Sequence, residues 1–287
     1  MRDNCQVPEL PEVEITASLI GDAVAGRIVE KVLAPGLNTI KTFDPPVQVL
    51  EGHALTGIRR RGKVFILGSS SGHSVLIHLM SAGKLQLFEK HASMKDRKSR
   101  LLIRLEGGDE LRLRETGTHQ RAWAKVVPTD EVETDEYLEG LGPEAWPDPP
   151  DLAGLLDGAR PLYTVLRDQR VIAGIGRSWV DEILWTAKLS PFKRGNDLTG
   201  DEAKGLRQAI IDRLGGAIET YESELELPLP DKLPLPLQVH RHEGDACPRC
   251  GDTIEAVHYN DYVMCYCPTD QTGGRPLKDR RLSRLLK

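Results

Sequence analysis

The sequence contains no apolar run near the roughly 18 residues that a membrane-spanning helix requires, and nothing at its start resembles a secretory signal. We therefore expect a cytoplasmic protein. Cysteine is also scarce: Cys5 stands alone, and the remaining four lie together between positions 247 and 267. That grouping favours a metal site over a disulfide framework. With 287 residues, of which 39% are hydrophobic and 28% charged, the chain is long enough for about two globular domains.

An overall excess of positive charge is lacking too, because the net charge is −5. The charges are nevertheless segregated along the chain. Residues 54–105 hold eleven Lys and Arg against two acidic residues, residues 128–157 hold ten acidic residues and no Lys or Arg, and residues 273–287 hold six Lys and Arg against one acidic residue. A polyanion would contact the basic regions rather than the average. On charge alone, solvated charged surfaces are an equally good interpretation.

The N-terminal region contains an unusual helix entrance, Pro-Glu-Leu-Pro-Glu-Val-Glu over residues 8–14. Pro11 suits the first helical turn, where its missing N–H costs nothing. Glu12 and Glu14 lie where the helix dipole favours negative charge. Because apolar residues then recur at helical spacing from Val13 to Val24, the segment predicts a helix.

The middle of the chain changes its periodicity twice. Short alternating segments separated by turn signals indicate an antiparallel sandwich or barrel; they are Arg27–Leu33, Ala54–Arg60, Val64–Gly68, Val75–Leu79, Leu85–Glu89, Leu101–Leu105, Glu110–Arg114 and Ala122–Val127. The acidic, proline-rich stretch around Pro143–Pro150 is typical of a linker. Helical periodicity follows, over Leu152–Leu156, Leu162–Asp168, Trp179–Ala187 and Asp201–Glu224.

Two further motifs lie in this second half. Gly174-Ile175-Gly176 precedes a predicted helix, and such a turn leaves backbone N–H groups able to approach a phosphate at the helix N-terminus. A tight turn with no ligand would look the same. Near the C-terminus, three cysteines predict a zinc site, namely Cys247, Cys250 and Cys267. The fourth ligand is Cys265, Asp270 or His258; a hairpin that folds without metal is the alternative.

These motifs together resemble the formamidopyrimidine-DNA glycosylase/endonuclease VIII family of base-excision repair enzymes. The residue 8–14 motif resembles its N-terminal signature, Asp168–Arg177 with the following Trp179 and Asp181-Glu182-Ile183-Leu184 is similar to its helix–two-turn–helix motif, and the cysteine module is similar to its zinc finger. The fragments Thr116–Arg121 and Gln271–Leu277 resemble an actinobacterial branch.

The resemblance implies an α+β multi-domain fold with an N-terminal helix, an antiparallel β-sandwich, a helical domain and a β-hairpin zinc finger. The expected boundaries are residues 1–7 for an extension that is disordered or precedes the true start, 8–130 for the catalytic sandwich, 131–150 for the linker, 151–236 for the helix–two-turn–helix domain and 237–287 for the finger with its basic tail. A monomer with a structural zinc ion is implied, bound to double-stranded DNA that carries a damaged base or abasic site.

The resemblance also implies roles for three residues. Pro8 would be the nucleophile that forms an iminium with the sugar, Glu9 the general acid–base group, and Lys63 the catalytic lysine between two strands. A proline inside a chain is a tertiary amide without a nucleophilic lone pair. Because GUG encodes valine and also initiates translation in bacteria, a start at Val7 would free Pro8 after methionine removal.

DNA contacts are expected from residues of the basic regions and of the family motifs, namely Met80, Lys98, Arg100, His119, Arg121, Gly174, Gly176 and Arg177. Met80 is either a void-filling wedge or a core residue. Thr118 and His119 replace the family's loop arginine and aromatic, and His119 is the candidate wedge. Arg177 replaces an asparagine, and Tyr262 replaces the hairpin arginine, so β-elimination is expected with weak or absent δ-elimination.

The expected function is therefore that of a bifunctional glycosylase and abasic-site lyase. The connector before the finger is short, which favours oxidised pyrimidines or ring-opened purines as substrates. A catalytically impaired, damaged-DNA-binding relative is the alternative. A nuclease or zinc-finger regulator is disfavoured because the chain has no carboxylate cluster for Mg²⁺ and no recognition helix.

Overall fold

The computed structural model describes residues 7–36, 38–93, 96–116, 120–156, 158–260 and 262–277. His119, residues 1–6 of the expected extension and residues 278–287 of the basic tail lie outside these ranges. Within them, no helix is both long and apolar enough to cross a bilayer. The elements in chain order are α1 (Leu10–Val24), β1 (Val29–Leu33), η1 (Val47–Leu50), β2 (Leu55–Arg61), β3 (Val64–Ser69), β4 (His73–His78), β5 (Gly83–Phe88), β6 (Ser99–Leu105), β7 (Glu110–Glu115), β8 (Trp123–Pro128), η2 (Thr129–Thr134), α2 (Glu136–Glu139), α3 (Leu152–Leu155), α4 (Leu162–Val165), α5 (Arg177–Thr186), η3 (Gly195–Asp197), α6 (Gly200–Glu224), β9 (Glu255–His258), β10 (Val263–Tyr266) and α7 (Pro268–Thr272).

The chain divides into two compact units. The first comprises the residues up to Gly140 together with Ile218–Pro234, and the second comprises Leu141–Ala217 and the chain from Leu235 onward. The last turns of α6 and the connector after it group with the N-terminal residues.

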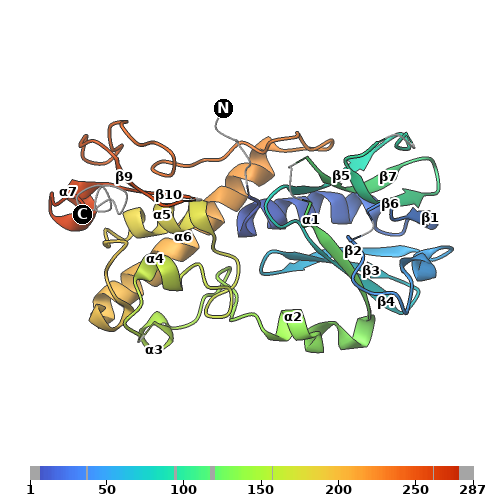
Figure 1. Ribbon diagram of the computed structural model, residues 1–287, viewed down its shortest axis with the longest axis horizontal. Helices are drawn as coiled ribbons and strands as arrows, with labels where there is room; N and C mark the ends of the chain where they lie inside the picture. Colours follow the sequence, from blue (N-terminus) through green and yellow to red (C-terminus); the bar gives the residue numbers. More distant parts are fainter. Residues whose placement is uncertain are drawn as a thin grey trace. The chain divides into compact units, whose positions relative to one another are not determined.

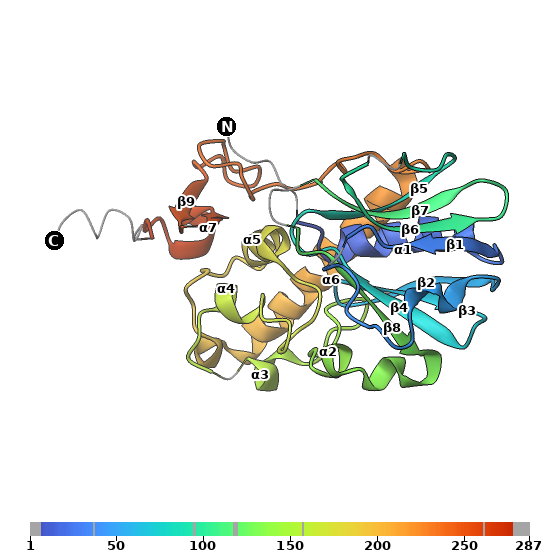
Figure 2. The same ribbon diagram turned by 45° about the vertical axis from the view of Figure 1, so that its right-hand side comes forward.

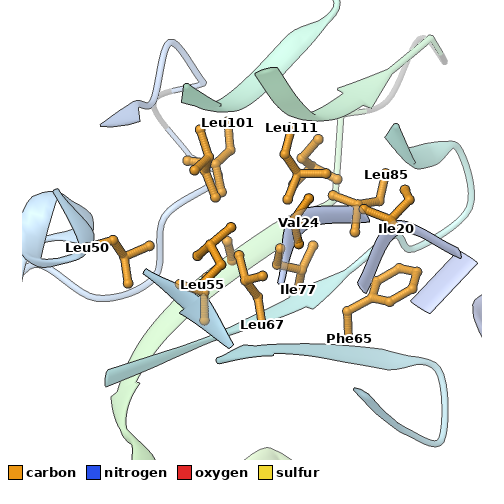
Figure 3. Close-up of a cluster of buried hydrophobic side chains, with 14 of the residues drawn as sticks. Ile20, Val24, Leu50, Leu55, Phe65, Leu67, Ile77, Leu85, Leu101 and Leu111 are labelled. Atoms are coloured by element: carbon orange, nitrogen blue, oxygen red, sulfur yellow. The ribbon is translucent and has the colours of Figure 1, made fainter. Parts of the chain in front are cut away.

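The first unit is a sandwich of two antiparallel four-stranded sheets, in the orders β1-β6-β7-β5 and β2-β3-β4-β8. Figure 1 shows α1 between them, with β5, β6 and β7 on one side and β2 and β3 on the other. In Figure 3, Ile20 and Val24 of α1 lie among core leucines and isoleucines of both sheets. Because apolar residues point inward from two sheets and one helix, the core is continuous, which confirms the predicted antiparallel sandwich.

Helix α1 begins as its sequence predicts. Glu9 is the N-cap, its side chain and that of Glu12 bond each other's backbone N–H in a capping box, and Pro11 lies in the first turn. The helix starts at Leu10, earlier than the apolar periodicity alone indicates. Its burial between two sheets explains this, because even its first-turn residues are enclosed.

The second unit consists of α3 to α5, most of α6, and a C-terminal β-hairpin. Trp179, Ile183 and Leu184 of α5 are almost completely buried. The carboxylate of Glu182 accepts the backbone N–H groups of Gln238, Val239 and His240 at 2.8–3.0 Å, which fixes the chain that leads into the hairpin. Strands β9 and β10 pair antiparallel, and α5 packs against β10 and α7 (Figure 2).

Candidate functional site

Two buried carboxylates occupy the entrance of α1. Glu9 and Glu12 are 1% and 3% exposed. Glu12 Oε2 accepts the Glu9 N–H at 2.8 Å, and Glu12 Oε1 accepts the hydroxyl proton of Tyr221 at 2.9 Å. Burial, and then the negative charge of Glu12 with its hydrogen bond, raises the pKa of Tyr221. Tyr221 therefore stays a neutral donor, and the last turns of α6 hold the carboxylates in place.

Pro8 lies directly outside α1, on the wall of a cavity of about 110 Å³. Further lining residues come from α1, from β5 with the turn before it, and from the connector after α6; they are Glu12, Thr16, Leu79, Ala82, Gly83, Lys84, Leu85, Gln86, Thr116, Leu229, Pro230, Asp231, Lys232 and Leu233. The lining thus combines apolar with charged and polar side chains, as is usual for ligand cavities.

The connector on the cavity wall is anchored to the sandwich. The Asp231 carboxylate lies 3.5 Å from both Lys84 Nζ and Arg114 Nη1, and Gln86 Nε2 donates to it at 3.3 Å. Arg114 Nη1 also donates to Gln86 Oε1 at 2.9 Å. Burial alone would raise the pKa of Asp231. The two cations and the Gln86 amide outweigh burial and hold this pKa below its ordinary value.

Lys63 occupies the two-residue turn between β2 and β3, after Gly62, whose φ of 56° is readily adopted by glycine. Burial, and then the positive charge of Lys63, lowers the pKa of His78 to about 4. His78 Nδ1 accepts the N–H of Met80 at 2.8 Å, and Met80 has a φ of 53°. The structure thus brings Lys63, His78 and the half-buried Met80 into one neighbourhood.

The other predicted sandwich residues are dispersed over the start of β6, with the residue before it, and the β7–β8 connection. Lys98 is exposed and Arg100 is half-buried. Arg121 is exposed, and its N–H donates to Glu115 Oε1 at 2.6 Å, which fixes the end of the connection that contains His119. No contact described in the structure joins these cations to Pro8.

The glycine turn is held by one side chain. Gln169 Oε1 accepts the Gly174 N–H at 2.9 Å, and Gln169 Nε2 donates to the Ile175 carbonyl at 2.7 Å. Gly174 has a φ of 111°, which requires glycine, whereas Gly176 is the extended N-cap of α5 and Arg177 is its first residue. The Gly174 N–H is therefore used inside the turn, so its role is to shape the helix entrance.

The cysteine module brings four possible ligands together. One ligand atom from each of Cys247, Cys250, Cys267 and Asp270 lies within 4.8 Å of the others. Three thiolates and a carboxylate suit a tetrahedral zinc ion, so the donor set fits this metal. Cys265 points elsewhere: its sulfur accepts the Arg241 N–H at 3.3 Å, and burial raises its pKa to about 12. His258 bonds Glu243 instead.

Two family profiles match this chain. The formamidopyrimidine-DNA glycosylase N-terminal domain profile matches residues 7–121, and the formamidopyrimidine-DNA glycosylase H2TH domain profile matches residues 142–228. A formamidopyrimidine-DNA glycosylase of Pediococcus pentosaceus is 30% identical over 91% of this chain and 98% of its own length. This chain belongs to the formamidopyrimidine-DNA glycosylase family.

Two further members of the formamidopyrimidine-DNA glycosylase family refine the comparison. An uncharacterised formamidopyrimidine-DNA glycosylase-like protein of Mycobacterium tuberculosis is 44% identical over 51% of this chain and 94% of its own, which agrees with the actinobacterial resemblance. The wild-type Lactococcus lactis enzyme, solved with DNA containing N7-benzyl-Fapy-dG, superposes with a TM-score of 0.82 at 26% identity, covering 92% of this chain and all of that one.

Several residues of this site gave little signal in the sequence. Tyr221 and Asp231 lie more than 140 positions from their partners in α1 and β5. His78 lies at the end of a segment whose pattern predicts only a buried strand. The helical periodicity of α6 was the one indication that Tyr221 faces inward.

Proposed function

We propose that this protein is a DNA glycosylase with abasic-site lyase activity that removes an oxidised or ring-opened base from double-stranded DNA. The observation that carries the proposal is the place of Pro8: it borders a cavity with polar and apolar lining residues, beside the buried carboxylates of Glu9 and Glu12. Membership of the formamidopyrimidine-DNA glycosylase family supports it, as does the Lactococcus lactis relative solved with DNA containing a ring-opened purine.

In the proposed reaction, the Pro8 amine attacks the sugar C1′. The new N–C1′ bond forms as the bond from C1′ to the base breaks; the Pro8 nitrogen gives up its N–H proton, which restores its lone pair and balances the proton that the departing base takes up. Glu9 protonates the sugar ring oxygen, the ring opens, and the nitrogen lone pair makes an iminium. This makes the C2′ proton acidic, so its removal expels the 3′ phosphate by β-elimination, and water then hydrolyses the iminium to free Pro8.

The nucleophile requires a free secondary amine. An amide nitrogen of a residue inside the chain is delocalised into its carbonyl group and does not attack carbon. The proposal therefore includes a chain whose first residue is Pro8, whether by initiation at position 7 followed by methionine removal or by cleavage.

We also propose which regions of the chain contact the duplex. Lys63 and Met80 lie together near His78 and would contact the strand that holds the lesion, with His119 as the wedge in the opposite stack. Lys98, Arg100 and Arg121 would meet backbone phosphates, as would the Gly174–Arg177 turn. Cys247, Cys250, Cys267 and Asp270 would hold a structural zinc ion, which supplies folding energy to the hairpin.

Borohydride trapping tests the proposal. A duplex with one abasic site is incubated with the 287-residue chain and with a chain that begins at Pro8, and covalent adducts are resolved by mass. The proposal predicts an adduct from the shorter chain alone, together with strand cleavage when borohydride is omitted.

The second candidate is a catalytically impaired relative that binds damaged DNA. Its support is that Val7 precedes Pro8 in this sequence and blocks the amine. Salt-sensitive duplex binding without any adduct from either chain would establish this candidate and overturn the enzyme proposal.

A further inference from the structure

An arginine of the C-terminal module contacts both the group of candidate metal ligands and helix α5. Arg249 lies between two of those ligands in the sequence, Cys247 and Cys250. Its Nη1 lies 3.4 Å from Oδ2 of Asp270, which is also one of the ligands. Its Nη2 donates to the Trp185 carbonyl at 3.0 Å, and its guanidinium carbon lies 4.2 Å from the centroid of the Trp185 ring. One side chain therefore links Asp270 to α5.

The guanidinium group of Arg249 is held from two sides by Trp185, which is 8% exposed. Stacking on the indole engages the flat face of the guanidinium, and the carbonyl takes one N–H of its edge, so other N–H groups of that edge remain for the carboxylate. Arg213 is the second cation over this ring, at 5.9 Å, but it pairs with Glu182 at 2.7 Å. Arg213 therefore serves a different carboxylate.

The charge of the ligand group gives the Arg249 contact its significance. Three thiolates and one carboxylate carry four negative charges, two more than the positive charge of a zinc ion. An excess of charge in a partly buried place is costly unless a cation or hydrogen-bond donors compensate it. Oδ2 of Asp270 lies 3.7 Å from the Cys247 sulfur as well as 3.4 Å from Arg249. The positive charge therefore lies at the ligand group itself.

A carboxylate ligand also needs its direction fixed, because it can rotate and offers two oxygens. Metal-binding carboxylates are generally held by a hydrogen-bonding partner outside the ligand set. We infer that Arg249, held by Trp185, is the positioning residue that makes Asp270 an effective metal ligand: it fixes the carboxylate and offsets part of the negative charge of the group. Arg249 itself touches no metal. The inference rests on the proposed function, which includes a zinc ion at this group.

The test is a double-mutant cycle on the full chain, with zinc affinity measured by competition with a chromophoric chelator. Loss of an outer partner costs roughly 10–100-fold in metal affinity, so Arg249→Gln is expected to weaken zinc binding by about tenfold or more. In a chain that carries Asp270→Cys there is no carboxylate to position, and Arg249→Gln should cost less. The ratio of the two losses measures the coupling and is expected to be of the order of tenfold.

Cobalt(II) bound in place of zinc gives a second readout, which a merely structural role of Arg249 would not change. The visible absorption bands of cobalt(II) depend on which atoms coordinate it. If Asp270 loses its direction, the bands of Arg249→Gln should shift towards those of Asp270→Ala. Arg275→Gln is the matched control, since it removes one exposed positive charge from the same module. It is expected to leave the zinc affinity and the cobalt(II) bands unchanged.

Arg249→Lys separates charge from geometry. Lysine keeps the positive charge but lacks the planar fork that bonds Asp270 and the Trp185 carbonyl together. Its zinc affinity is expected to lie between those of Arg249→Gln and the unaltered chain. If Arg249→Gln does not fold, Arg249→Lys with and without Asp270→Cys provides the same cycle.

A zinc affinity of Arg249→Gln equal to or higher than that of the unaltered chain overturns the inference and leaves the proposed function standing. Equal losses with and without Asp270→Cys, with unshifted cobalt(II) bands, show that Arg249 only stabilises the hairpin, and they overturn the inference as well. Failure of the unaltered chain to bind zinc or cobalt(II) overturns the metal site of the proposed function instead, whereas borohydride trapping decides its chemistry separately.

Discussion

Pro8 and Pro11 have different roles at the start of α1. Pro11 lies in the first turn of α1, where its missing N–H and fixed φ favour helix initiation. Pro8 lies before the helix and borders the cavity. The capping box of Glu9 and Glu12 fixes the backbone at the start of α1. This also fixes the position of Pro8, which directly precedes Glu9.

Replacing Pro8 by glycine, in a chain that begins at position 8, tests the nucleophile directly. The ring fixes the direction of the nitrogen lone pair, whereas glycine offers a flexible primary amine. We expect borohydride trapping to fall by about a hundredfold, as for other misplacements of a reacting group, while duplex binding is kept. Undiminished trapping would refute the assignment of Pro8.

His78 gives a prediction about pH and stability. Its pKa is about 4 in the folded chain and 6.5 at its ordinary value, because burial and then Lys63 oppose its charge. As the pH falls from about 6.5 towards 4, the unfolded chain takes up a proton that the folded chain does not, so stability declines. The maximum decrease from this group is of the order of 3 kcal/mol.

The variant His78→Asn removes the titrating group and keeps an acceptor for the Met80 N–H. Its melting temperature should therefore vary less between pH 6.5 and 4 than that of the unaltered chain. His53→Asn, which changes an exposed histidine of the same unit, is the control. Parallel melting curves for His78→Asn and the unaltered chain would contradict the explanation.

At the scale of elements, the C-terminal turns of α6 support the N-terminus of α1 through the Tyr221–Glu12 hydrogen bond. Tyr221→Phe leaves a buried carboxylate oxygen without this donor, which costs about 1–3 kcal/mol. We expect a lower midpoint in urea unfolding. Tyr137→Phe, on a ring that is 39% exposed, should change the midpoint little; equal effects of both variants would contradict the role of Tyr221.

The C-terminal hairpin is predicted to depend on Asp270. Its carboxylate completes the group formed with Cys247, Cys250 and Cys267. Removal of a residue that merely supports a ligand already costs roughly 10–100-fold in metal affinity, so Asp270→Ala should weaken zinc binding by at least about tenfold. Asp270→Cys should strengthen it, because thiolate is the softer ligand.

Cys265→Ala is the control for this series, since the Cys265 sulfur accepts a backbone N–H rather than joining the group. Zinc affinity is measured by competition with a chromophoric chelator. An effect of Cys265→Ala that exceeds that of Asp270→Ala would show that the fourth ligand is Cys265.

At the scale of the whole molecule, a net charge of −5 coexists with strongly basic segments. Six of the last fifteen residues are Lys or Arg. Replacing Lys278, Arg280 and Arg281 together by glutamine should weaken duplex binding and lower the salt slope, by about 0.9 for each phosphate that the tail no longer neutralises. An unchanged slope would mean that this tail is only a solvated end.

Much of the fold could be predicted from the sequence. The alternation of residues 54–127 indicated the strands, and the proline with its two glutamates indicated the start of α1, because both signals are local. The grouping of the last turns of α6 with the N-terminal residues could not be predicted. Helix α6 has one continuous periodicity, yet Ile218–Pro234 group with the N-terminal residues. Which elements a helix packs against along its length depends on the fold of the whole chain, which periodicity does not encode.

The sequence by itself determined the family, the place of Pro8 before a capped helix and three of the four residues in the group that could hold a metal ion. Short motifs carry these features, since each depends on neighbours a few residues away. Only the tertiary structure decided that Asp270 joins the cysteines while Cys265 does not, that Tyr221 bonds Glu12, and that Arg249 links Asp270 to Trp185. Each of these arrangements depends on the direction of a side chain from a distant element, and packing alone fixes that direction.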